Sequence, residues 1–157
     1  MDNEYYMKIA LEEARRGFDM GEVPIGCIIV YEGEIIGRGA NERATRKNVL
    51  CHAEITAISQ ACDALGDWRL EGCRLYVTLE PCPMCAGAIV QARIPVVVYG
   101  AKSPKAGCVG SIYNLLDEPR FNHQAEVISG VCEDECANLM SEFMQTLRKK
   151  DTNKISR

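Results

Sequence analysis

The chain has 157 residues, of which 47% are hydrophobic and 25% are charged, and its formal net charge is −4. This composition is close to that of an average soluble globular protein, and it excludes disordered, collagenous and fibrous chains. The length suits one compact domain, which we expect over residues 1–150. A basic tail at 151–157 follows, and we expect it to fray.

The apolar stretches of the chain are too short for a membrane-spanning helix, which needs about 18 or more apolar residues. The first residues, among them Asp2 and Glu4, are acidic where a signal peptide needs positive charge. We therefore expect a cytoplasmic protein without membrane association. The nine cysteines, an odd number, fit reduced thiols, some of them bound to a metal, better than a secreted disulfide scaffold.

Charge is distributed unevenly along the chain. The acidic balance argues against a general nucleic-acid coat, because non-specific binding depends on neutralising phosphates. Residues 38–47 nonetheless carry four basic side chains against one acidic, and the residues from Arg148 onward carry five against one. A local basic patch that contacts RNA is therefore compatible with the sequence.

Hydrophobic periodicity and turn residues divide the chain into helices and strands. In the first 20 residues, Met7, Ala10, Leu11, Ala14 and Phe18 recur at steps of three and four, which predicts a helix. Later segments alternate β-branched runs with runs of helix formers. In chain order we expect a helix at 1–20, strands at 25–31 and 34–39 joined by a hairpin, a polar loop at 41–48, a helix at 53–64, a strand at 75–79, a helix at 83–93, a strand at 96–100, a short helical segment at 112–117, a strand at 125–129 and a last helix from about residue 134.

This order of elements predicts the α/β class. Strands that alternate with helices form a sheet covered on both faces, so we expect a three-layer α/β/α sandwich around a mixed, largely parallel, five-stranded sheet. Ligands bind such sheets at the carboxyl ends of strands, where the following helices begin. Two short motifs of the sequence fall at predicted helix starts of this kind.

The two motifs are His52-Ala53-Glu54 and Pro81-Cys82-Pro83-Met84-Cys85. A Cys-x-x-Cys pair at a helix start places two sulfurs within one turn, where unpaired N–H groups and the helix dipole favour the thiolates that bind metal. His52 supplies a third ligand. Because three protein ligands leave the fourth tetrahedral position of Zn²⁺ open for water, the pattern predicts a catalytic zinc site formed by His52, Cys82 and Cys85.

Glu54 is predicted to be the catalytic residue rather than a metal ligand. In the first helical turn its side chain can point to the space beside the metal. Zinc lowers the pKa of its bound water to roughly 7, so a carboxylate there can take the proton and pass it to a substrate nitrogen. This is hydrolytic chemistry with water as co-substrate, and the H-x-E…P-C-x-x-C pattern resembles the signature of the zinc nucleobase deaminases.

The cysteines and the second histidine allow plainer interpretations. A structural zinc site would need a fourth ligand, for which Cys51 is the best candidate. Cys51 is adjacent to His52, however, so its side chain should point elsewhere, and we expect a buried apolar thiol. Cys132 and Cys136 could form a second metal pair, but they continue an apolar helix stripe, and we expect core packing. For His123 we expect a structural or RNA-adjacent role.

From about Tyr6 to Arg148 the sequence resembles the bacterial tRNA-specific adenosine deaminases of the cytidine deaminase-like zinc deaminase superfamily. The zinc signature alone is shared with cytidine and guanine deaminases and indicates only the superfamily. The strings around it favour the tRNA branch: Glu22-Val23-Pro24-Ile25-Gly26, Gly37-Arg38-Gly39-Ala40-Asn41, Leu75-Tyr76-Val77-Thr78-Leu79-Glu80, Ala86-Gly87-Ala88, Gly110-Ser111, Asn122-His123 and Glu135-Cys136-Ala137-Asn138-Leu139-Met140.

The resemblance implies hydrolysis of the wobble adenosine in a tRNA anticodon stem-loop to inosine, by a homodimer with one Zn²⁺ per subunit. It implies that His52, Cys82 and Cys85 hold the zinc and that Glu54 moves protons between the water, the purine ring and the leaving ammonia. It also implies that Asn41 contacts the substrate nucleoside, since its amide offers both a donor and an acceptor to a purine edge.

Substrate binding is implied as well for Ser103, in the loop 102–111, and for Phe143, near Arg148 in the last helix. A flipped base needs a stacking or apolar wall, and the neighbouring phosphates need cations. Ser103 stands where many family members have Asp or Asn, and Met144 stands where a second aromatic residue often follows. Both departures concern how RNA is held rather than the zinc ligands.

Two other functions stay open at this point. A free-base or nucleoside deaminase, such as a guanine deaminase, would use the same metal chemistry in a closed pocket without an RNA groove. The acidic overall charge and Ser103 favour it slightly. A non-catalytic zinc-bearing subunit that binds RNA is the second alternative. An intact Glu54 argues against it, because a purely structural role gives no reason for a carboxylate in that place.

Overall fold

The structure is a computed structural model that describes residues 2–155, and the side chains of residues 2–150. Its elements follow the expected order. They are α1 (Asn3–Asp19), β1 (Gly26–Tyr31), β2 (Glu34–Ala40), α2 (Arg43–Arg46), α3 (Ala53–Leu65), β3 (Cys73–Leu79), α4 (Pro83–Ala92), β4 (Val96–Ala101), η1 (Leu115–Asp117), β5 (Glu126–Ile128) and α5 (Glu133–Ile155). The one additional element is a short helix, α2, and the short helical segment expected near residue 115 is a 3-10 helix, η1.

The strands form one mixed five-stranded sheet, as predicted, and their order in the sheet is β2-β1-β3-β4-β5. β1 is antiparallel to both β2 and β3, whereas β3, β4 and β5 run parallel. The expectation of a largely parallel sheet is wrong, because two of its four pairings are antiparallel. An alternation of helices and strands does not specify that β3 pairs with β1 rather than with β2, and this pairing makes the second antiparallel contact.

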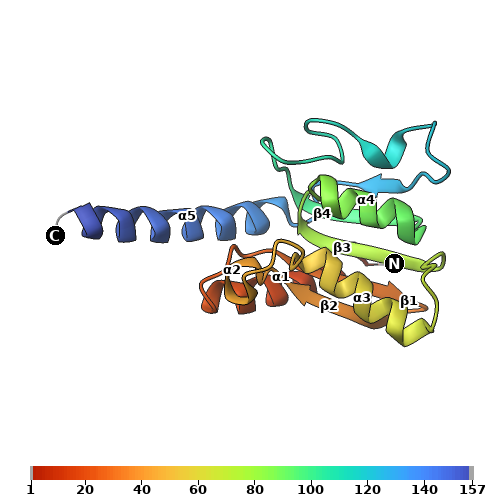
Figure 1. Cartoon of the computed structure of the whole chain (residues 1–157), viewed down its shortest axis with the longest axis horizontal. Coiled ribbons are helices and arrows are strands. Elements are labelled where there is room, and N and C mark those ends of the chain that lie inside the picture. The colour runs from red at the N-terminus through yellow and green to blue at the C-terminus, as the bar shows by residue number, and fades with distance from the viewer. Residues whose placement is uncertain (1, 156–157) are drawn as a thin grey trace.

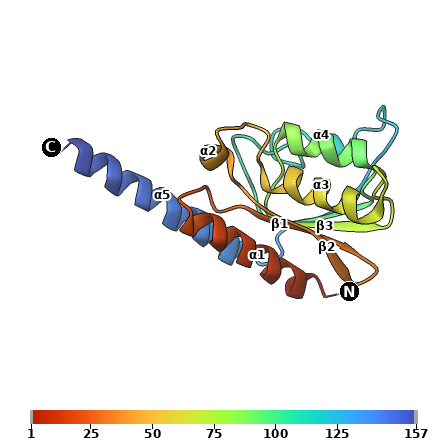
Figure 2. The ribbon, with the colours of Figure 1, turned by 60° about the horizontal axis from the view of Figure 1, so that its bottom comes forward.

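Helices cover both faces of the sheet. α3 and α4 lie on one face, and α1 and the beginning of α5 lie on the other (Figure 2). Alternate side chains of the central strands enter the two cores: Leu75 and Val97 pack with α3 and α4, whereas Tyr76 and Val98 pack with α1. The α/β/α sandwich is therefore confirmed.

α3 approaches β2 closely, because two glycines of that strand present no side chain to the helix. A Cβ atom at Gly37 would lie 2.2 Å from the carbonyl oxygen of Ala57, and one at Gly39 would lie 2.2 Å from the carbonyl oxygen of Ala53. No side chain fits at such distances. The glycines therefore determine how α3 lies on the sheet and where its first turn is.

Three segments differ from the expected elements. The polar loop after β2 contains α2, whose backbone N–H groups donate to the distant Glu22 carboxylate, a contact that local sequence does not reveal. Only the last half of the segment 112–117 is helical, as η1. α5 extends beyond the rest of the molecule (Figure 1). It ends at Ile155 and so includes most of the residues of the basic tail expected at 151–157.

The fraying expected at 151–157 and the domain boundary at residue 150 stay predictions, and residues 156 and 157 lie outside the described residues. None of the described helices is both long enough and apolar enough to cross a membrane.

Candidate metal centre and active site

The three predicted metal ligands meet where α3 and α4 begin. His52 is the N-cap residue of α3, Cys82 is the N-cap residue of α4, and Cys85 lies in the first turn of α4. The Nδ1 atom of His52 lies 3.5 Å from the Sγ atom of Cys82 and 3.5 Å from that of Cys85. The ligand atoms of all three lie within 4.8 Å of one another, and no other group of this kind occurs among the described residues.

This donor set fits zinc. One imidazole nitrogen and two thiolates are preferred Zn²⁺ ligands, and Zn–N and Zn–S bonds of about 2.0 and 2.3 Å place tetrahedral donors roughly 3.5 Å apart. Cys51 does not belong to the group, although it precedes His52. Its thiol is half-buried rather than buried as expected, because the chain before α3 runs at the surface. A three-ligand metal site is therefore favoured over a closed structural one.

The pKa values of the Cys82 and Cys85 thiols are coupled through a hydrogen bond between them. A hydrogen bond from the Cys85 thiol, together with backbone N–H groups of the first turn of α4, lowers the pKa of Cys82 to about 5. The same hydrogen bond and burial raise the pKa of Cys85. The lowered pKa favours the thiolate of Cys82, which is the form that a metal requires.

Glu54 lies in the first turn of α3 and is 4% exposed. Burial raises the pKa of its carboxyl to about 7. The carboxyl also interacts with the side chains of Cys82 and Cys85, so it borders the ligands without belonging to their group. A carboxyl in this state can hold or release a proton near neutral pH, as general acid–base catalysis requires.

Asn41 lies in the loop between β2 and α2 and is 5% exposed. Its Oδ1 atom accepts a hydrogen bond of 3.4 Å from the backbone N–H of Arg43. The following residue, Glu42, donates its backbone N–H to the carbonyl oxygen of Cys51 at 2.9 Å. The loop that carries Asn41 is therefore joined to the residue before His52.

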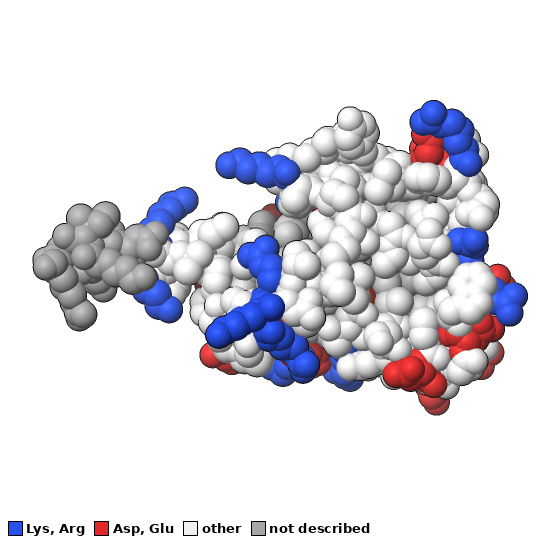
Figure 3. Space-filling model, viewed as in Figure 1, with Lys and Arg blue, Asp and Glu red and all other residues white. Residues whose placement is uncertain are grey.

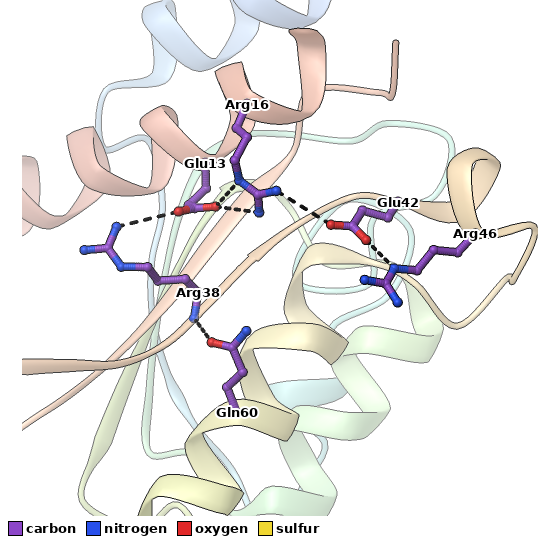
Figure 4. Close-up of polar contacts among 6 residues, drawn as sticks. All are labelled: Glu13, Arg16, Arg38, Glu42, Arg46 and Gln60. Atoms are coloured by element: carbon purple, nitrogen blue, oxygen red, sulfur yellow. Dashed lines mark hydrogen bonds and ion pairs between the residues drawn. The ribbon is translucent and has the colours of Figure 1, made fainter. Parts of the chain in front are cut away.

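A chain of ion pairs connects this loop to α1 (Figure 4). Arg16 of α1 pairs with Glu13 and lies 3.7 Å from Glu42, which also pairs with Arg46 of α2. Arg38 of β2 joins the chain through Glu13. Exposed pairs contribute only about 0–1 kcal/mol each. Their arrangement nevertheless places charged partners from α1, β2 and α2 on each side of the loop.

The sequence analysis did not assign roles to Glu22 and Glu80, which are both 2% exposed. Glu22 accepts hydrogen bonds from the backbone N–H groups of Ala44 and Thr45 in α2. Glu80 accepts from the backbone N–H of Ser103 and from other groups of the same loop. Burial raises the pKa of both carboxyls, but these hydrogen bonds outweigh it and lower both values. The available signal was an acidic residue beside an apolar run, since such residues are rarely buried unless paired.

The other two predicted substrate residues lie on separate elements. Ser103 follows β4, and its backbone N–H is 3.1 Å from the Oε1 atom of Glu80. Phe143 of α5 is 5% exposed and packs edge-on against Phe18 of α1, with ring centroids 5.8 Å apart. Phe143 thus lies in the layer opposite α3 and α4, and its role toward the substrate stays a prediction.

The remaining histidine and cysteine interpretations agree with the structure. The Nε2 atom of His123 lies 2.7 Å from the carbonyl oxygen of Ile94, as a structural histidine would. Cys136 is 2% exposed in the core beneath α1, and Cys132 packs against the same core, so core packing of this pair is confirmed. Cys132 has a φ of 53° and precedes α5 rather than lying on it.

Basic side chains gather beside the loop that carries Asn41. Arg43, Arg46 and Lys47 of α2 and its C-cap are all exposed. Figure 3 shows Lys and Arg gathered over α2, whereas acidic side chains lie toward the far end of α3. The overall acidic charge of the chain therefore coexists with a basic surface near the metal centre.

Comparisons with known proteins show that the chain is similar to deaminases. A model of the MafB19-like deaminase family matches residues 1–148. The tRNA-specific adenosine deaminase of Bacillus subtilis (strain 168) is 57% identical over 148 residues, which are 94% of this chain and 92% of that protein. The chain belongs to the tRNA-specific adenosine deaminase family.

Two solved structures of deaminases have folds similar to that of this chain. One, from a study of A-to-I editing by tRNA:A34 deaminases at the wobble position of transfer RNA, matches with a TM-score of 0.83 at 46% identity. The match covers 86% of this chain and 98% of the chain in that structure. The guanine deaminase of Bacillus subtilis matches with a TM-score of 0.64 at 37% identity, over 80% of this chain and 83% of its own. The adenosine deaminase is thus the more similar of the two in both sequence and structure.

The metal centre predicts that Cys82→Ala removes the bound metal. After equilibration with Zn²⁺ and removal of excess ion, elemental analysis should find about one zinc per wild-type chain and less than about a tenth of that in the variant, because two protein donors hold zinc poorly. Cys62→Ser is the matched control, since Cys62 is also half-buried but lies ten residues after His52, about 15 Å along α3. Full zinc content in Cys82→Ala would contradict the assignment.

Proposed function

We propose that this chain is a zinc-dependent hydrolase that deaminates adenosine to inosine at the wobble position of a tRNA anticodon. The observation that carries the proposal is the group formed by His52, Cys82 and Cys85 with the buried carboxyl of Glu54 beside it. The choice of tRNA adenosine as substrate is supported by the 57% identity to a tRNA-specific adenosine deaminase over nearly the whole chain.

In this proposal His52, Cys82 and Cys85 hold one Zn²⁺ per chain. When bound, zinc lowers the pKa of a water molecule to about 7 and thereby supplies a nucleophile at neutral pH. Glu54 takes the proton of the attacking water and delivers it to N1 of the purine. After water has added at C6, the Glu54 carboxylate takes the remaining proton from the new C6 hydroxyl and transfers it to the exocyclic amine, and ammonia leaves as the carbonyl of inosine forms.

Asn41, Ser103 and Phe143 are the proposed substrate-binding residues. The buried amide of Asn41 has the donor and acceptor that a nucleoside requires, and the loop that carries it is attached beside His52. Ser103 lies in a loop whose neighbouring residues Lys102 and Lys105 are exposed, which suits contact with phosphates. Phe143 is the least directly supported of the three, since its ring packs against Phe18.

Free-base deamination is the second candidate, because the guanine deaminase of Bacillus subtilis resembles this chain over 80% of its length. Its lower identity of 37%, against 57% for the adenosine deaminase, favours the tRNA substrate. A non-catalytic RNA-binding subunit is disfavoured, because a buried Glu54 carboxyl beside the ligands costs stability that a structural site has no reason to lose.

The proposed enzyme is a cytoplasmic homodimer that pairs through α3 and α4. α4 is apolar along most of its length, and its small residues Gly87 and Ala88 are partly exposed. Next to them, the 57% exposed Trp68 borders a hollow that is lined largely by apolar side chains of both helices. A helix that is apolar all round is usually buried. A second copy of the chain can bury this surface in a two-fold contact.

The substrate prediction is tested with zinc-loaded protein and three substrates: an anticodon stem-loop with wobble adenosine, free adenosine and guanine. We expect inosine and ammonia from the stem-loop alone. A stem-loop with its adenosine moved away from the wobble position is the matched control and should be inert. Xanthine from guanine, with an inert stem-loop, would move the chain to the free-base deaminases.

The role of Glu54 predicts that Glu54→Gln keeps one zinc per chain but lowers kcat on the stem-loop by about 10²-fold or more, because the amide cannot accept the proton. Glu71→Gln, at an exposed position, is the control and should behave like wild type. Wild-type turnover by Glu54→Gln would refute the proposed proton transfer.

The dimer prediction is that the wild-type chain has twice the mass of one chain in light scattering at micromolar concentration. Ala88→Arg places a charge in the proposed apolar contact and should shift the mass toward that of a monomer. Asn138→Arg, which adds the same charge at an exposed position of α5, should leave it unchanged. A monomeric wild-type chain would exclude the dimer.

A further inference from the structure

The loop that follows β4 closes around one buried carboxylate, that of Glu80. The Oε1 atom of Glu80 accepts a hydrogen bond of 3.1 Å from the backbone N–H of Ser103 and one from the hydroxyl of Ser111. The Oε2 atom accepts from the backbone N–H groups of Val109 and Ser111, each at 3.0 Å. Donors from the beginning and the end of the loop 103–111 thus converge on a single side chain.

Gly107 lies where the loop passes over this carboxylate. A Cβ atom at Gly107 would lie 2.3 Å from the carboxyl carbon and from one oxygen of Glu80, and 2.5 Å from the other oxygen. The backbone N–H of Gly107 donates to the carbonyl oxygen of Ser103 at 2.7 Å, which closes the turn. The path of the loop therefore requires both the Glu80 carboxylate and a residue without a side chain above it.

The same contacts join the loop to the metal centre. Glu80 comes two residues before the ligand Cys82, and the residue between them, Pro81, accepts a hydrogen bond of 2.9 Å from the backbone N–H of Cys108. The backbone N–H of Glu80 donates to the carbonyl oxygen of Ala101 at 2.9 Å, at the end of β4. The stretch that carries the metal ligand is thus also the anchor of the loop.

The loop has little regular structure that could maintain its shape without Glu80. Its one bridge joins Val109 to Asn114, and the segment from Lys102 to Ala106 has exposed or half-exposed side chains. Backbone N–H groups that point inward need an acceptor, and a carboxylate with two oxygens supplies several at once. An amide in the same place would direct its own N–H groups at backbone donors.

We propose that Glu80 is a positioning residue for the deamination, which holds the loop 102–111 in the shape that receives the RNA. This inference rests on the proposed function and deepens it. Glu80 acts through the loop, which carries Ser103 and the exposed Lys102 and Lys105, and it does not touch the substrate. The hydrogen bonds of the Glu80 carboxylate go to the loop rather than to the ligand side chains or to Glu54, so binding should suffer more than the chemical step.

The test compares wild type with Glu80→Gln, Ser111→Ala and the control Glu118→Gln. Glu118 also accepts a loop N–H, from Arg120, but lies in a different loop. For each protein, zinc content, kcat and KM on the anticodon stem-loop, and hydrogen exchange of the amides of Ser103, Val109 and Ser111 are measured. The exchange measurement needs no substrate, so it reports on the loop even if the protein does not deaminate the stem-loop.

For Glu80→Gln we expect faster exchange at these amides, unchanged zinc content, and KM raised about tenfold or more with kcat changed less than about threefold. Ser111→Ala keeps the backbone contact and should raise KM in the same direction by a smaller factor, which preserves the test if Glu80→Gln fails to fold. Glu118→Gln should match wild type in all respects.

Two results would overturn the inference. Faster loop exchange with wild-type KM in Glu80→Gln or Ser111→Ala would mean that the loop shape does not serve RNA binding. A fall in kcat or zinc content at unchanged KM would mean that Glu80 acts on the metal centre instead. If wild type itself left the stem-loop unchanged, the proposed function would fail, and the exchange data would still report whether Glu80 holds the loop.

Discussion

The contact between α3 and the glycines of β2 is the constraint on which the metal centre depends. Gly37 and Gly39 let the helix backbone approach the strand backbone, so α3 can adopt only a narrow range of positions on the sheet. A shift of one residue along a helix moves a side chain by about 1.5 Å and rotates it by roughly 100°. Such a shift would separate the His52 nitrogen from the sulfurs of Cys82 and Cys85. Those two residues lie at the start of α4, which follows a different strand, β3.

Backbone N–H groups stabilise most of the buried or half-buried anionic side chains around the site. Glu22 accepts them from α2, Glu80 from the loop 103–111, and Cys82 from the first turn of α4. The pKa of each of these three groups is lowered. Glu54 is the exception, because burial outweighs its polar contacts and raises its pKa to about 7. This contrast separates the carboxylates that maintain structure from the one that can exchange protons.

The sequence predicted the elements well, and it selected the three side chains that the structure brings together as a group able to hold a metal, because both depend on local patterns. Helix periodicity, the hairpin glycine and the Cys-x-x-Cys spacing each act within a few residues, and His52 and Cys82 both turned out to be helix N-caps. The pairing of β3 with β1 was not predictable, because strand order depends on contacts across the whole sheet. α2 and the roles of Glu22 and Glu80 were missed for a related reason. These contacts join carboxylates to backbone N–H groups more than 20 residues away, and every residue type except proline can supply such a group.

Selection between an RNA adenosine and a free base must come from outside the metal centre. A guanine deaminase shares the fold at 37% identity, and the zinc signature does not distinguish it from the tRNA branch. The two loops beside the ligands, one with Asn41 and one with Ser103, are each anchored by a buried glutamate. Because the anchors are hydrogen bonds to backbone atoms, side chains on the outer surface of these loops can change without moving the loop backbone. Ser103, where the family resemblance leads us to expect an acidic or amide residue, is such a change: its backbone N–H keeps the contact with Glu80, and only its side chain differs.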